Sequence, residues 1–202
     1  DPKLGELLRE GIDTQSLANN AMKGVNNSDK PNEMVRQARS AAKLMAADDG
    51  PRIAAMAFDG WDTHENEGGA KGRLFNLLTG LDGALAEFEN ALGPVWNQTS
   101  IVVMTEFGRT ARINGTVGTD HGTGSLAFLA GGAIKGGRVI ADWPGLKDAD
   151  LYEQRDLKPT TDLRSVVKGL LADQFGFSEQ TLADKVFPDS GAAKPMQGLI
   201  SA

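Results

Sequence analysis

Apolar residues recur at helical spacing in four stretches of the chain, which are residues 3–24, 31–47, 72–92 and 161–174. A repeat of every three or four residues places apolar side chains on one face of a helix, so each stretch is a predicted helix. The clearest is 72–92, where Gly93-Pro94 follows the last apolar position and ends the helix. Its apolar stripe consists of Leu74, Leu77, Leu78, Leu81, Leu85, Phe88 and Leu92.

Three short apolar runs have no helical period and are predicted strands, at residues 53–58, 101–105 and 126–130. Near-continuous apolar runs separated by an amphipathic helix are typical of parallel sheets with helices on both faces. The fold class expected from this order is α/β, a doubly wound, mainly parallel sheet flanked by helices. We expect residues 1–50 to form a helical segment packed on a core of residues 51–187, with a loosely ordered tail at 188–202.

Composition narrows the classes of function. The 202 residues carry a formal net charge of −6, which argues against a nucleic-acid-binding surface. No run of about 20 apolar residues is present, so no membrane span is expected. The chain has no cysteine, which excludes disulfides and thiolate ligands. It begins at Asp1 without an initiator methionine or signal peptide, so we expect a fragment or a processed form.

The only two histidines of the chain each lie within two residues of an aspartate, in glycine-flanked segments. Asp62 and His64 follow the predicted strand 53–58, and Asp120 and His121 lie in the loop after strand 101–105. Carboxylate oxygen and neutral imidazole nitrogen suit zinc or manganese. Parallel strands would bring both loops to one sheet edge, where α/β proteins bind ligands. The alternative is that each pair is an ordinary surface pair or turn former.

Two charged residues follow strand 101–105 in the same loop. Glu106 is an additional candidate ligand for the metal. Arg109 is a candidate catalytic residue, because a planar guanidinium can donate to a phosphate or sulfate oxygen. The alternative is that Glu106 and Arg109 form a salt bridge with each other. The glycine-rich segment 131–137 fits a hairpin turn better than a phosphate-binding loop.

Several motifs together resemble a bacterial sulfatase-like family of unknown function within the alkaline phosphatase superfamily, often exported with a twin-arginine signal. These motifs are Gly60-Trp61-Asp62-Thr63-His64-Glu65-Asn66, Thr105-Glu106-Phe107-Gly108-Arg109-Thr110, Gly118-Thr119-Asp120-His121-Gly122, Gly131-Gly132-Ala133-Ile134-Lys135-Gly136-Gly137 and Leu157-Lys158-Pro159-Thr160-Thr161-Asp162. The resemblance implies an alkaline phosphatase/sulfatase-like fold without its N-terminal portion, and a periplasmic or exported location. It also implies one or two divalent ions, zinc or manganese first and calcium as an alternative. Asp120 and His121 would hold one ion, and Asp62 and His64 would hold or share the other.

The chain departs from the phosphatase pattern in its spacing, since Asp62 and His64 are two residues apart rather than four, and a third histidine is missing. A single metal, or Glu106 or water as a substitute ligand, is therefore an open alternative. The nucleophile is not identified. The expected function is a metal-dependent hydrolase of phosphate or sulfate esters, acting on a small anionic ester. The alternative is a non-catalytic exported protein of the cell envelope that binds a metal or another ligand.

Overall fold

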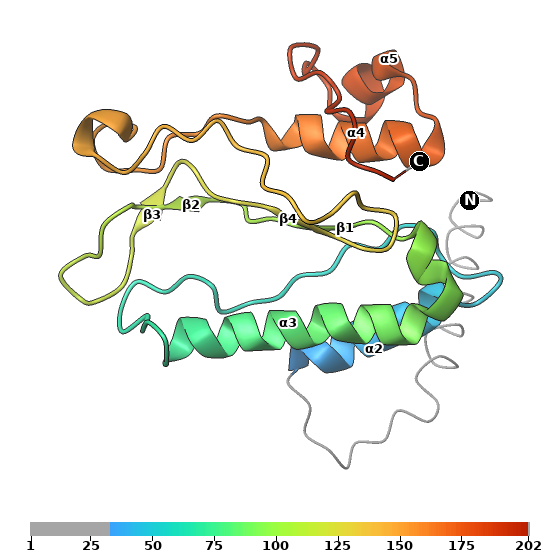
Figure 1. The fold of residues 1–202 in the computed structure, drawn as a ribbon, viewed down its shortest axis with the longest axis horizontal. Coiled ribbons are helices and arrows are strands. Elements are labelled where there is room, and N and C mark those ends of the chain that lie inside the picture. Colours follow the sequence, from blue (N-terminus) through green and yellow to red (C-terminus); the bar gives the residue numbers. More distant parts are fainter. Residues whose placement is uncertain (1–32, 202) are drawn as a thin grey trace, which may run out of the picture. The chain divides into compact units, whose positions relative to one another are not determined.

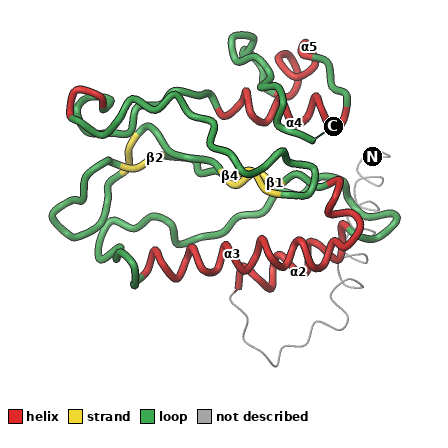
Figure 2. Tube along the Cα trace, viewed as in Figure 1, coloured by secondary structure: helices red, strands yellow, loops and turns green. Residues whose placement is uncertain are grey.

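The computed structural model describes residues 33–201, so the predicted helix 3–24 lies outside the described residues. Two compact units are formed, one of residues 33–62 and 69–96 and the other of residues 63–68 and 97–201. The elements in chain order are α2 (Glu33–Met45), α3 (Arg73–Leu92), the 3-10 segment η1 (Gly93–Gln98), β1 (Ile101–Val103), β2 (Gly108–Arg109), β3 (His121–Gly122), β4 (Phe128–Ala130), the 3-10 segment η2 (Asp148–Asp150), α4 (Leu163–Phe175), α5 (Glu179–Thr181) and the π-helical segment η3 (Leu182–Val186). Figures 1 and 2 show these elements along the chain.

The first unit is built on α2 and α3, which confirm the predicted helices 31–47 and 72–92. The two helices pack against each other through small residues: Ala38 of α2 is fully buried, and a Cβ on Gly83 of α3 would lie 2.9 Å from Val35 Cγ2. At the edge of this contact Arg39 donates two hydrogen bonds to the carboxylate of Glu87, at 2.7 and 3.1 Å. Close approach of the two backbones therefore holds this pair together.

The predicted strand 53–58 is wrong. In the structure these residues form no strand, and most of them are exposed, with Ile53 at 64%. A short apolar run rich in alanine satisfies the pattern of a buried strand, but the pattern does not say which strand would pair with it. Without that partner these residues form no ladder.

The doubly wound parallel sheet is also wrong. The described residues contain two short antiparallel sheets of two strands each: β1 pairs with β4, and β2 pairs with β3. The fold is therefore not that of the alkaline phosphatases. Strands β1 and β4 do lie within the predicted runs 101–105 and 126–130. The error lay in the partner, because a parallel pairing across α3 must close a longer loop than an antiparallel pairing within residues 101–130.

The four strands form one long, irregular hairpin. Ile101 pairs with Ala130 in the first ladder and Gly108 pairs with Gly122 in the second, so the two registers differ by one residue. Residues 101–109 run outward, residues 110–120 form the tip, and residues 121–130 return. Figure 1 shows this excursion from β1 through β2 and back through β3 to β4. The second histidine, His121, therefore begins the returning arm directly after the tip.

The core of the second unit lies between α4 and the sheet β1–β4. The predicted helix 161–174 is confirmed as α4, whose N-cap Asp162 accepts a hydrogen bond from the Arg164 amide. Buried Val166 and Leu170 of α4 pack with Leu199 near the end of the chain. The partly buried residues around them are Val102, Leu129, Ile134, Met196 and Ile200. The helix thus anchors both the hairpin and the C-terminal segment.

Residues 188–202, for which the sequence predicts loose order, make specific contacts as far as residue 201. The fully buried side chain of Lys168 donates to the carbonyl oxygens of Ser190 and Ala193, at 2.7 and 2.9 Å. Ile200 forms a bridge with Ile134. These two bonds provide acceptors for the buried amino group of Lys168, which would otherwise be costly to bury.

Candidate metal centre

The segment that carries the first histidine lies along the tip of the hairpin, in the second unit. Three backbone hydrogen bonds join the two: Asn66 N to Thr116 O at 3.0 Å, Glu67 N to Val117 O at 3.0 Å, and Thr119 N to Thr63 O at 3.2 Å. A Cβ on Gly118 would lie 2.3 Å from the carbonyl carbon and oxygen of His64. Only glycine allows this approach, because the obstructing atoms are backbone.

This contact brings the two histidines together. The ring centroids of His64 and His121 are 4.9 Å apart, and one ligand atom each from Asp62, His64 and His121 lie within 4.8 Å of one another. Ligand atoms of a tetrahedral zinc ion are about 3.4 Å apart, given bonds of about 2.0–2.1 Å. The three exposed side chains could close that difference by rotation. Asp62 lies two residues before His64 in the sequence.

Asp120 is not one of these three residues, although the sequence predicts it as a ligand. Its Oδ1 atom lies 3.2 Å from Nδ1 of His64 and accepts a hydrogen bond from Nδ2 of Asn114 at 2.9 Å. The bond from Asn114, followed by the one from His64, lowers the pKa of the Asp120 carboxyl below its usual value. Asp120 therefore faces His64 as a carboxylate, and a carboxylate there orients an imidazole that binds a metal.

His121 is held by stacking. Its ring lies against the ring of Phe107, with centroids 4.0 Å apart and an angle of 18° between the planes. The guanidinium of Arg109 lies over the same Phe107 ring, 5.2 Å from its centroid, and donates to the carbonyl oxygen of Thr119 at 2.8 Å. Arg109 is also the residue opposite His121 in the ladder β2–β3. Through these contacts Arg109 helps to hold Phe107 and His121 in place. The role in anion binding that the sequence predicts for Arg109 stays a prediction.

Glu106 does not join the cluster, and its side chain is exposed. The hydroxyl groups in the same loops have protein partners: Thr119 donates to Glu67 at 2.9 Å, Thr123 donates to buried Asp156 at 3.0 Å, and Ser125 lies 3.2 Å from the hydroxyl oxygen of Thr105. These hydrogen bonds stabilise the loops.

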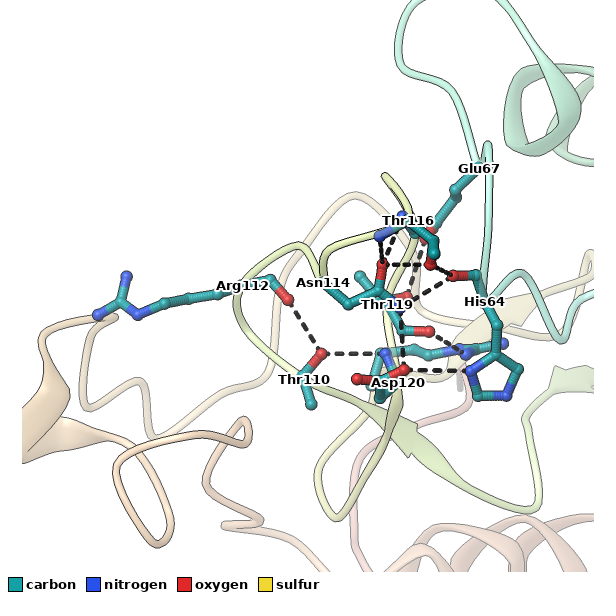
Figure 3. A network of polar contacts seen from close by, with 10 residues as sticks. His64, Glu67, Thr110, Arg112, Asn114, Thr116, Thr119 and Asp120 are labelled. Carbon is teal, nitrogen blue, oxygen red and sulfur yellow. Dashed lines mark hydrogen bonds and ion pairs between the residues drawn. The ribbon is translucent and has the colours of Figure 1, made fainter.

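Sequence reasoning missed two residues of the site, Phe107 and Asn114. Figure 3 shows Asn114 between His64, Asp120 and Thr116. The pair Asn114-Gly115 is a turn signal and places Asn114 in a loop. The sequence contains no signal for the atoms that its amide contacts, because they belong to residues up to 50 positions away. The sequence does not distinguish Phe107 from a phenylalanine of the hydrophobic core.

The fold and the cluster define a mixed α and β protein with an exposed group of two histidines and an aspartate that can ligate a metal. The chain belongs to the family described as "Protein of unknown function (DUF1501)", which matches residues 5–187. No curated protein and no solved structure matches the chain. The family match shows no relationship to sulfatases or to the alkaline phosphatase superfamily, so that part of the resemblance is wrong. Along the described chain, no helix combines the length and the apolar character needed to cross a membrane.

Proposed function

We propose that this protein binds a single divalent transition-metal ion through Asp62, His64 and His121. The observation that carries the proposal is that both histidines of the chain lie close to each other and to an aspartate. His64 and His121 are 57 residues apart in the sequence. One carboxylate and two imidazoles are a ligand set for zinc, manganese or iron. Calcium suits the site less, because it prefers six to eight oxygen ligands.

The surroundings of the cluster support binding of an ion. Each histidine has a neighbour that restrains its ring, Asp120 for His64 and Phe107 for His121. Three protein ligands leave at least one position of a tetrahedral ion for water or a substrate, which distinguishes catalytic sites from closed structural ones. All three residues are exposed, so a ligand from solution can reach them.

The reaction class that fits such a site is hydrolysis. A bound divalent ion supplies Lewis-acid chemistry, polarising an ester oxygen and lowering the pKa of a water molecule. Asp62, His64 and His121 would hold the ion, while Asp120 keeps the ring of His64 in place. Small phosphate or sulfate esters are the substrate class that we propose. Arg109 would support the site through Phe107 and favour the negative charge of such a substrate.

The second candidate is metal binding without catalysis. It is favoured by the hydrogen bonds that occupy the hydroxyl groups of Thr119, Thr123 and Ser125, which leave those side chains poorly placed as nucleophiles. A protein of this kind would sequester or carry a metal at an exposed site. The two candidates share the ligands and differ only in turnover.

Calorimetric titration of metal-stripped protein with Zn²⁺ and Mn²⁺ tests the site. Replacing His121 or His64 with Ala removes a ligand and should weaken binding by more than about 100-fold. Loss of a residue that only supports a ligand already costs up to about 100-fold in metal affinity. The matched control is Lys135→Ala, which removes an exposed charge from another loop and should change nothing. Equal affinity in wild type and His121→Ala would contradict the proposal.

Turnover separates the two candidate functions. Wild type and His121→Ala would be assayed on aryl phosphate and aryl sulfate with Zn²⁺, Mn²⁺ or no metal. Metal-dependent hydrolysis that is lost in His121→Ala would support catalysis. Tight binding of the ion without turnover of either ester would favour the carrier role.

A further inference from the structure

The side chain of Asn114 connects the two loops of the candidate metal centre. Its Nδ2 donates to the carbonyl oxygen of His64 at 2.8 Å and to Oδ1 of Asp120 at 2.9 Å. Its Oδ1 accepts from the amides of Thr116 and Gly118, both at 3.0 Å. The two ends of this amide therefore have different roles. The oxygen end stabilises the hairpin tip, and the nitrogen end reaches the residues beside the metal cluster (Figure 3).

The nitrogen end bears on the protonation of the His64 ring. An ionised Asp120 can only accept hydrogen bonds, so the His64 nitrogen that faces it, Nδ1, must carry the proton. The hydrogen bond at one ring nitrogen decides which nitrogen is left with a lone pair for a metal. In a neutral ring with the proton on Nδ1, that nitrogen is Nε2. Asn114 holds the same oxygen atom of Asp120 that His64 contacts.

We propose that Asn114 is a positioning residue of the metal centre, which holds the Asp120 carboxylate against Nδ1 of His64 and so leaves Nε2 as the ligand atom. The inference rests on the proposed function, because it assigns Asn114 a role in metal binding. The hydrogen bond from Asn114 to His64 goes to the main-chain carbonyl oxygen, so the effect on the ring is transmitted by Asp120. Outer partners of metal ligands contribute about 10- to 100-fold to metal affinity.

The variant Asn114→Ser separates the two ends of the amide. A serine hydroxyl at this position can still accept from an amide two residues on, as serine does in turns, but it is too short to reach Asp120. The matched control is Thr116→Val. It removes the hydroxyl that lies 2.8 Å from the same His64 carbonyl oxygen and 2.9 Å from Asn114 Oδ1, and it leaves the bond between Asn114 and Asp120 in place.

The first measurement needs no metal. Nitrogen-15 NMR reports which nitrogen of the neutral His64 ring carries the proton. The chain has two histidines, so the spectrum of His121→Ala identifies the signals of His64. We expect His64 to carry its proton on Nδ1 in wild type and Thr116→Val, and to shift towards the Nε2-protonated form in Asn114→Ser. Zn²⁺ affinity should fall about tenfold in Asn114→Ser and change less than about twofold in Thr116→Val.

Each outcome decides the proposal. An unchanged His64 tautomer in Asn114→Ser overturns it, even if the metal centre itself is real. Equal shifts in Asn114→Ser and Thr116→Val also overturn it, because they would show general loosening of the tip. If His121→Ala binds Zn²⁺ as tightly as wild type, the metal centre fails and the metal-positioning role fails with it. The NMR result then still shows whether Asn114 sets the tautomer.

Discussion

The helix pair α2–α3 and the loops around the two histidines are stabilised by different kinds of contact. In the helix pair, small apolar residues such as Ala38 and Gly83 let two regular backbones approach closely. In the loops, single polar side chains, above all Asn114, hydrogen-bond to backbone and carboxylate atoms of distant residues. The first region is therefore sensitive to side-chain volume and the second to loss of one donor or acceptor. Residues that can carry chemistry lie in the second.

The largest expected effect is a stability loss from a volume change in the helix pair. Ala38→Leu inserts three carbons at a fully buried position, and overpacking of this kind costs about 1–3 kcal/mol. Urea unfolding followed by circular dichroism measures the loss. Ala41→Leu, at a half-buried position of the same helix, is the control and should cost less. Zn²⁺ affinity should stay within about twofold in both variants, since neither residue belongs to the cluster of Asp62, His64 and His121.

Gly118→Ala is the corresponding change in the loops. The added methyl group would overlap the backbone of His64, so the two segments must separate and displace that ligand. Zn²⁺ affinity should fall on the order of tenfold, as it does when the support of a ligand is lost. Gly115→Ala is the matched control, because a Cβ there meets open space. Similar affinities in the two variants, measured by calorimetry, would mean that close approach at Gly118 does not position His64.

Acid should weaken the second unit through Asp156. Burial raises the pKa of this carboxyl, but hydrogen bonds from Arg155 and Thr123 outweigh it, and the net pKa lies below its usual value. A carboxyl whose pKa is lowered by folding stabilises the protein at pH values above its pKa in the unfolded chain, which is about 4. That stabilisation disappears as the pH falls through the pKa in the folded chain. At pH 7 the free energy of unfolding of wild type should exceed that of Asp156→Asn by roughly 1 kcal/mol, the scale of a hydrogen bond.

Measuring the free energy of unfolding of both proteins from pH 7 to pH 2.5 would test this prediction. The gap between wild type and Asp156→Asn should shrink below about pH 4, where the aspartate becomes protonated in the unfolded chain. A gap that is constant over the whole range would show that the charge of Asp156 is not responsible.

The smallest expected effect concerns the ion pair of the helix pair. A double-mutant cycle of Arg39→Ala and Glu87→Ala should give a coupling of about 0.5–1 kcal/mol, because the pair is partly buried and makes two hydrogen bonds. The exposed pair Arg36 and Glu33 is the comparison and should give a smaller coupling. A larger coupling in the exposed pair would show that burial does not strengthen the contact between Arg39 and Glu87.

Prediction from sequence succeeded best for the helices. The predicted ranges 31–47, 72–92 and 161–174 overlap α2, α3 and α4 closely, and Asp162 and Gly176 at the two ends of α4 make the bonds expected of caps. The strands were harder. Runs 101–105 and 126–130 contain β1 and β4, but run 53–58 forms no strand, and the parallel pairing was wrong.

For the site, the sequence indicated Asp62, His64, Asp120 and His121, and three of them form the cluster while Asp120 contacts His64. The reason given was wrong, since parallel strands do not bring these residues together. The hairpin tip does so, through its backbone bonds to residues 63–67. Asn114 and Phe107 could not be assigned, because their partners are His64, Asp120 and His121 in the folded chain.

The sequence by itself determined where the helices lie and which chemistry is available. A helix closes its hydrogen bonds within four residues, so a local apolar period is enough to predict it, and two histidines beside aspartates already limit the ligands to imidazole and carboxylate. Only the tertiary structure decided that the strands pair as an antiparallel hairpin and that Asp120 faces His64. Strand pairing and side-chain hydrogen bonds join residues far apart in sequence, and many alternative partners satisfy the same local pattern.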